Sequence, residues 1–201
     1  MKKFTLLLVF MLASYFTYSQ DVDKIKELGF TTNNLNDFGI TYRTGSEKSL
    51  WRFNAISSSI SKRTSSDDSS NDTWTSLGFG VQFGKEWRKL LSQKFELRYG
   101  LDLAFNFSNS KDENFDPATP DLITKYITNS YRSGINAVLG FNFVFAEGFL
   151  VGAEFQPAIS YSKEKSEMHN PNAQEPITSE SDNLSFGLST DALRLSLIYR
   201  F

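Results

Sequence analysis

Few residues of this 201-residue chain have the types and spacing of a catalytic site. His169 is the only histidine, so the chain cannot supply a histidine-based triad or a multi-histidine metal site. Two S-x-x-K tetrapeptides (59–62 and 162–165) and an S-D-N tripeptide (181–183) match motifs of penicillin-recognising serine enzymes. Residues 43–45 mimic the third motif of these enzymes but precede the others. We therefore predict no enzymatic activity, no cofactor and no metal.

Two other motifs suggest phosphate or cation binding. Gly78, Gly80 and Gly84 form a glycine-rich run, but it lies within an alternating segment and no helix follows it. Close packing inside a barrel explains these glycines better. Residues 67–72 (DDSSND) carry oxygen ligands but lack the spacing of a calcium loop, so we expect a flexible polar loop.

One constellation of charged residues remains, on the polar positions of the alternating segments. It contains both signs and comprises Arg43, Arg52, Glu96, Arg98, Asp102, Arg132, Glu154, Arg194 and Arg200. Inside a barrel these side chains either line a narrow passage for ions or small solutes, or pair and close it. The interior of an eight-stranded barrel is just wide enough to be filled by side chains, which favours the closed form.

The elements that carry these charges are predicted to be strands. In residues 94–108, apolar side chains from Phe95 to Phe107 fall on odd positions and polar ones on even positions, which places them on opposite faces of a strand. The pattern recurs in 131–145, 149–161 and 193–201, and more weakly in 38–42, 50–60, 77–83 and 184–188. The only helix candidate is 21–28. Long polar connections are expected at 61–72, 109–129 and 163–182, and shorter ones at 44–49, 85–93, 146–148 and 190–191.

The apolar face of these strands must be covered. Burying one Leu or Phe is worth roughly 1.5–3 kcal/mol, so the apolar face of 94–108 alone represents about 10–20 kcal/mol. A soluble barrel would turn this face inward, as in a lipocalin-like ligand carrier, and a membrane barrel would turn it to lipid. The opposite face is rich in Gly, Asn and charges of both signs, and aromatic residues gather near strand ends; both features favour the membrane barrel.

The first residues of the chain have the pattern of a secretory signal. Lys2 and Lys3 precede an apolar stretch (4–13), and small residues at Thr17 and Ser19 predict cleavage after Ser19. With no cysteine there is neither a lipid anchor nor a disulfide framework, and a formal net charge of −2 excludes a nucleic-acid binder. We expect a signal peptide (1–19), a short periplasmic segment (20–35) and an outer-membrane barrel (36–201).

The C-terminal run LRLSLIYRF, with Leu195, Leu197, Tyr199 and Phe201 on one face, resembles the signal read by the outer-membrane barrel assembly machinery. With the stretches FGITYRTG (38–45), LWRFN (50–54) and FELRYG (95–100), the chain is similar to the small outer-membrane β-barrel proteins of Bacteroidota, the PorT-like group. The resemblance implies outer-membrane lipids, the assembly machinery and periplasmic chaperones as partners. It also allows a part in a secretion or envelope assembly system, and it carries no catalytic motif.

The fold predicted from these observations is all-β: a closed antiparallel up-and-down transmembrane barrel of eight strands. A cut at Thr190-Asp191 gives eight strands but directs the long connections into the periplasm if Phe201 is periplasmic. A single strand over 183–201 directs them outward but leaves seven, unless 24–35 supplies another. The expected role is structural or surface-interacting, through the long loops. A lipid-modifying enzyme is the alternative that the lone His169 argues against.

Overall fold

Strands make up nearly all of the structure, a computed structural model that describes residues 24–33, 37–66, 71–116, 121–171, 173, 175–187 and 192–201. The predicted signal peptide and its cleavage site lie outside these residues. No helix long and apolar enough to cross a membrane occurs in the described ranges. The strands are β1 (Ile25–Thr32), β2 (Phe38–Ser46), β3 (Ser49–Ser66), β4 (Asn71–Leu90), β5 (Phe95–Phe115), β6 (Leu122–Ala146), β7 (Phe149–Phe155), β8 (Ala158–His169), β9 (Ile177–Gly187) and β10 (Leu193–Arg200).

The strands close into an antiparallel barrel with eight wall positions. The hydrogen-bonded ring runs β1-β2-β3-β4-β5-β6-β7-β10 and returns to β1. β8 continues the wall above β7 after an interruption at Gln156-Pro157, because both pair with β6. β9 pairs with β8 and stands above β10 in the same way. The predicted closed all-β barrel of eight strands is therefore confirmed.

The eighth wall position is β1, a strand that the sequence analysis gave only as an alternative, within residues 24–35. The helix expected over 21–28 is wrong for residues 25–28, and the segment assigned to the periplasm (20–35) contributes β1 to the wall, so the barrel begins at Ile25 rather than at residue 36. Glu27, Gly29 and Thr31 face inward while Leu28 and Phe30 face outward. This alternation is too short to outweigh the near-helical spacing of Val22, Ile25 and Leu28.

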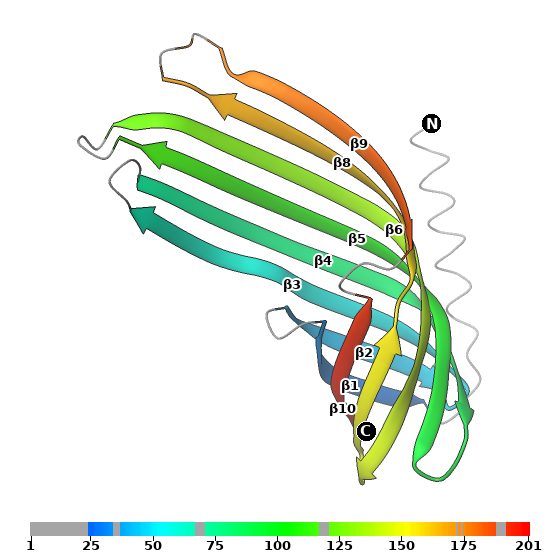
Figure 1. Cartoon of the computed structure of the whole chain (residues 1–201). Helices are drawn as coiled ribbons and strands as arrows, with labels where there is room; N and C mark the ends of the chain where they lie inside the picture. The colour runs from blue at the N-terminus through cyan, green and yellow to red at the C-terminus, as the bar shows by residue number, and fades with distance from the viewer. Residues whose placement is uncertain are drawn as a thin grey trace.

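The two ends of the barrel differ. The tight turns β2–β3 and β6–β7, the short β4–β5 connection and both ends of the described chain lie at one end, which we call the turn end (Figure 1). There the backbones of Lys26 and Phe201 exchange hydrogen bonds of 3.2 and 2.9 Å. Gly148 has a φ of +75° in the β6–β7 turn, a conformation that favours glycine. β9 and β10 thus follow a single wall position, and the β3–β4, β5–β6 and β8–β9 strand pairs extend toward the other end.

At that other end six strands continue beyond β1, β2 and β10 as a curved sheet (Figure 1). We call this the extension: β8, β9 and the parts of β3, β4, β5 and β6 that are next to them in register, from about residues 60–66, 71–78, 108–115 and 122–132. The connections expected at 61–72, 109–129 and 163–182 are therefore mostly strand. The sequence pattern of these segments resembles that of loops, because both faces of the extension meet water and the alternation of apolar residues is therefore lost.

Candidate functional site: the barrel interior

The alternation of each strand turns its polar positions into the barrel. Outward side chains on β5 such as Leu101 and Leu103 are 54% and 61% exposed, whereas the inward Arg98 and Asp102 are 0% and 1% exposed. The alternative of a soluble barrel with its apolar face turned inward is therefore wrong. In the described ranges, few apolar residues are buried in the barrel: Leu50, Ile56, Val138, Leu150, Ala192 and Ile198.

The inward charges form one network, which we call the charge cluster. Six arginines (Arg43, Arg52, Arg88, Arg98, Arg194, Arg200) meet five carboxylates (Glu27, Glu86, Glu96, Asp102, Glu154). Seven of the eight wall positions contribute a charge, and β6 contributes Asn142, which donates a 3.0 Å hydrogen bond to Glu96. Polar side chains removed from water must find partners of this kind.

Glu86 on β4 and Glu154 on β7 are the central anions of the cluster. Arg52 bridges them, with 3.0 Å from Nη1 to Glu86 Oε2 and 2.8 Å from Nη2 to Glu154 Oε1. Arg98 also bridges them, at 3.0 and 3.1 Å. Because β3 and β7 stand on opposite sides of the ring, the Arg52–Glu154 contact crosses the lumen and ties opposite walls together.

A second group of ion pairs lies closer to the turn end. Arg88 binds both oxygens of Glu27 at 2.7 Å and reaches Glu86 at 2.6 Å. Arg200, beside the C-terminus, joins Glu27 and Glu96 at 2.8 Å each. Bidentate arginine–carboxylate contacts fix orientation as well as distance. They fix how β1, β4, β5 and β10 sit against one another.

Arg43 on β2 lies at the middle of the cluster and is completely buried. Its guanidinium is 3.6 Å from Glu27, 3.8 Å from Glu154 and 4.0 Å from Glu86. It therefore holds the two groups of ion pairs together by charge.

Glycines give the long side chains room. A Cβ at Gly152 would lie 2.9 Å from Asn142 Oδ1 and 3.2 Å from Arg98 Nη2, and one at Gly140 would lie 2.7 Å from Glu154 Cβ. Gly84 stands against Asp102 in the same way. Gly84, one of the glycines that the sequence analysis attributed to close packing, therefore has this role.

The cluster contains eight of the nine charges that the sequence singled out. The ninth, Arg132, lies on β6 where the extension begins; its side chain is exposed and forms no ion pair with any residue the structure describes. Sequence reasoning missed Glu27, Glu86 and Arg88. Glu27 fell in the expected helix, and the other two fell in the connection expected at 85–93. Extending the even-numbered parity of Gly78, Gly80 and Gly84 to residue 88 would have found them.

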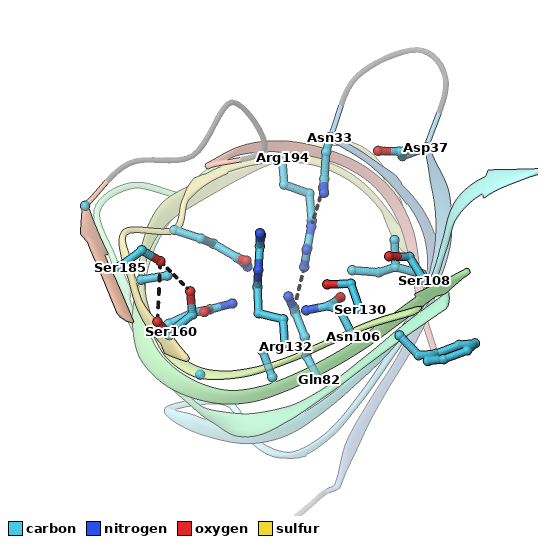
Figure 2. A pocket seen from close by; sticks show the side chains of 18 of the residues that line it. Asn33, Asp37, Gln82, Asn106, Ser108, Ser130, Arg132, Ser160, Ser185 and Arg194 are labelled. Atoms are coloured by element: carbon cyan, nitrogen blue, oxygen red, sulfur yellow. Dashed lines mark hydrogen bonds between the residues drawn. The ribbon is translucent and has the colours of Figure 1, made fainter. Parts of the chain in front are cut away.

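A cup opens directly above the charge cluster, toward the extension (Figure 2). Its volume is about 450 Å³, and Gln82, Gln156 and Arg194 are among the residues that line it. Arg194 donates 2.8 Å hydrogen bonds to Asn33 and Gln82 and lies 3.5 Å from Glu154, so it joins the cup to the cluster.

The outside of the barrel is a belt of apolar side chains with aromatic contacts near both borders. Toward the turn end Trp51 stacks on Phe83 at 5.1 Å, with Lys85 Nζ 4.5 Å from the Trp51 ring, and toward the extension Phe107 contacts Tyr131 at 5.1 Å. The C-terminal set belongs to this belt: Leu195, Leu197, Tyr199 and Phe201 are 47–59% exposed. Trp74, by contrast, shares the inner face of the extension with Asp112.

No protein-family model matches this chain, and no curated protein matches it in sequence. Among solved structures, it is similar to a major outer membrane protein from Thermus thermophilus, with a TM-score of 0.52 and 11% identity over 90% of this chain and 100% of that one. Ail, the attachment invasion locus protein of Yersinia pestis, aligns with a TM-score of 0.30 and 11% identity over 89% of this chain and 95% of Ail. The first likeness shows that the barrel fold is shared, and the second is too distant to add to it.

Proposed function

We propose that this chain is an integral outer-membrane β-barrel protein whose interior is closed by the charge cluster and whose extension acts at the cell surface. The observation that carries the proposal is the inverted distribution of polarity: fully buried arginines inside and half-exposed Leu and Phe outside. Water would disfavour such an exterior, and hydrocarbon favours it. The shared fold with an outer-membrane protein supports the same location.

The orientation follows from the two ends of the barrel. Outer-membrane barrels have short periplasmic turns and longer extracellular segments. The turn end, with its tight turns and both ends of the described chain, is accordingly the periplasmic end, and the extension projects outward. The predicted signal peptide would deliver the N-terminus to the same side.

The role proposed for the interior is closure. Side chains from strands that are not neighbours in the ring meet across the lumen, as the contacts of Arg52 with Glu154 (2.8 Å), Arg88 with Glu27 (2.7 Å) and Arg98 with Glu154 (3.1 Å) illustrate. A steady passage for ions would require several of these contacts to break together. We propose a structural and surface-interacting protein rather than a channel or an enzyme.

Single-channel recording in planar bilayers tests closure. The wild-type barrel should give no steady conductance, whereas Glu86→Ala together with Glu154→Ala should give openings, because five buried guanidinium groups then lose their central partners and repel one another. A Glu180→Ala variant, altered only on the exposed β9, should stay closed. Steady open-state conductance of the wild type would contradict the proposal.

The PorT-like resemblance adds a finer proposal, that the extension serves a secretion or envelope assembly system. The extension supports it by offering a large surface beyond the membrane belt. Deleting the gene and comparing protein secretion with envelope permeability tests it: a loss of secretion with intact permeability is expected, and unchanged secretion would contradict it.

A further inference from the structure

The cup above the charge cluster has a defined lining. Arg132 stands opposite Asn106 on β5 and Ser162 on β8, and Ser162 stands opposite Asn183 on β9, so the four share the inner face. One row closer to the cluster lie Gln82, Ser160 and Ser185. The volume of about 450 Å³ is within the range of small-molecule sites, ~300–1,000 Å³.

Arg132 is a cation of the cup that forms no ion pair there, and the carboxylate in the described lining, Asp37, lies on the Asn33 side of the lumen (Figure 2). Figure 2 shows the side chains of Arg132 and Arg194 pointing into the lumen. Arg194 is engaged with Asn33, Gln82 and Glu154, but Arg132 has neither an ion pair nor a hydrogen bond to any side chain in the described ranges. Glu164, one row further out opposite Ser130, forms no ion pair with it there. The cluster below adds six arginines against five carboxylates, so the floor does not supply the missing anion.

Most of the remaining polar side chains of the lining are hydroxyls and amides. Ser130, Ser160 and Ser185 offer hydroxyl groups, and Asn106, Asn136 and Asn183 offer carboxamides, so donors and acceptors surround the space. Ser160 and Ser185 already share a 2.8 Å hydrogen bond across β8 and β9. Among the apolar lining residues that face inward, Ala104 and Ala158 are small, and Ile56 is buried. This lining suits a ligand covered with hydroxyl groups and offers little to an apolar one.

We propose that the cup binds a small anionic saccharide from the outside. Its carboxylate pairs with the guanidinium of Arg132, and its hydroxyl groups exchange hydrogen bonds with the serine and asparagine side chains around it. An arginine–carboxylate contact is the strongest single interaction this lining can make. The inference rests on the proposed function in one respect: the charge cluster closes the floor, so the cup holds the ligand instead of passing it.

Calorimetric titration of the purified full chain in detergent micelles tests the inference, with glucuronate as the probe and glucose and acetate as comparisons. Glucuronate should bind more tightly than either. Arg132→Gln should weaken glucuronate binding by about 10- to 100-fold, the equivalent of one charge-assisted contact, and should leave glucose unaffected. Arg63→Gln is the matched control, because Arg63 is an exposed arginine on the same face, opposite Trp74 near the tip of the extension.

Each of the other possible results contradicts one specific part of the inference. Equal affinity of wild type and Arg132→Gln for glucuronate overturns the assignment of Arg132. Acetate binding as tightly as glucuronate overturns the saccharide and leaves a bare anion site. Loss of binding in Arg63→Gln places the site elsewhere. A wild type that is closed in bilayers but binds no glucuronate refutes this inference alone, whereas a conducting wild type refutes the proposed function.

Discussion

The ring of the barrel and its extension are built from the same strands, yet their inner faces differ. Within the ring, β5 turns Glu96, Arg98 and Asp102 inward, and all three are buried. Beyond the ring the same strand turns Ser108 and Ser110 inward, where they are partly exposed. The alternation of the strand continues unchanged, and only the surroundings change.

The outer face of β5 changes over the same few residues. It presents Leu101, Leu103 and Phe105 within the belt and Lys111 and Glu113 beyond it. Closure of the ring therefore decides what an inward residue must be, and lipid decides what an outward residue must be. Where neither applies, in the extension, both faces carry polar residues, and ion pairs such as Lys163–Glu180 remain in water.

The largest expected difference in unfolding free energy comes from making the same Glu→Gln substitution in the ring and in the extension. Glu154 and Glu180 each form an ion pair, at 2.8 Å with Arg52 and at 2.9 Å with Lys163, but only the first pair is buried. Glu154→Gln should lower the free energy of unfolding by about 3–5 kcal/mol, because Arg52, Arg98 and Arg194 lose a carboxylate without access to water.

Glu180→Gln is the control and should not change the unfolding free energy measurably, because its partner stays solvated. Urea unfolding of the refolded barrel in detergent, followed by tryptophan fluorescence, measures both variants. Equal destabilisation would show that burial does not decide the strength of these pairs.

A second comparison concerns the outer faces. Leu101→Arg places a cation in the belt and should cost about 2–4 kcal/mol in a bilayer, the cost of a cation facing hydrocarbon at mid-membrane. Thr178→Arg on β9, opposite Glu167, should be neutral because that face meets water. Unfolding from lipid vesicles measures both, and an unaffected Leu101→Arg would contradict the assignment of the belt to lipid.

The alternation was sufficient to predict the fold and the inward position of most charges, because a period of two assigns each residue of a strand to a face. It could not identify partners. Glu154 meets Arg52 across 102 residues, and no local pattern encodes that contact. Nor could it show that Arg132, on the same parity as the other charges, lies above the cluster, since its height depends on how the strands tilt around the ring.

Strand limits failed for another physical reason. Residues 25–32 and 85–90 mix charges with few apolar side chains, and the hairpins of the extension bury neither face fully. Backbone pairing with neighbouring strands, which is not visible in the sequence, stabilises these segments. The assembly-signal role of Leu195, Leu197, Tyr199 and Phe201 stays a prediction from their resemblance.

The smallest expected effect is on the pH dependence of the extension. The hydrogen bond from Lys163 lowers the pKa of Glu180 below its usual 4.5 and raises that of Lys163 above its usual 10.5. Lys165 lowers the pKa of Glu167 in the same way. A lowered carboxyl pKa stabilises the hairpin above the unfolded value and loses that effect as the pH falls through the folded value.

The β8–β9 hairpin should therefore open more readily as the pH falls from about 6 to about 3, and change little through neutral pH, where both partners are charged. Amide hydrogen exchange of β9, corrected for the intrinsic rate, measures this opening. Glu180→Gln should show a smaller change, with Glu167 accounting for what remains. Because these side chains are fully solvated, the effect should be far below that of Glu154→Gln, and an equal effect would mean that the extension is as closed to water as the ring.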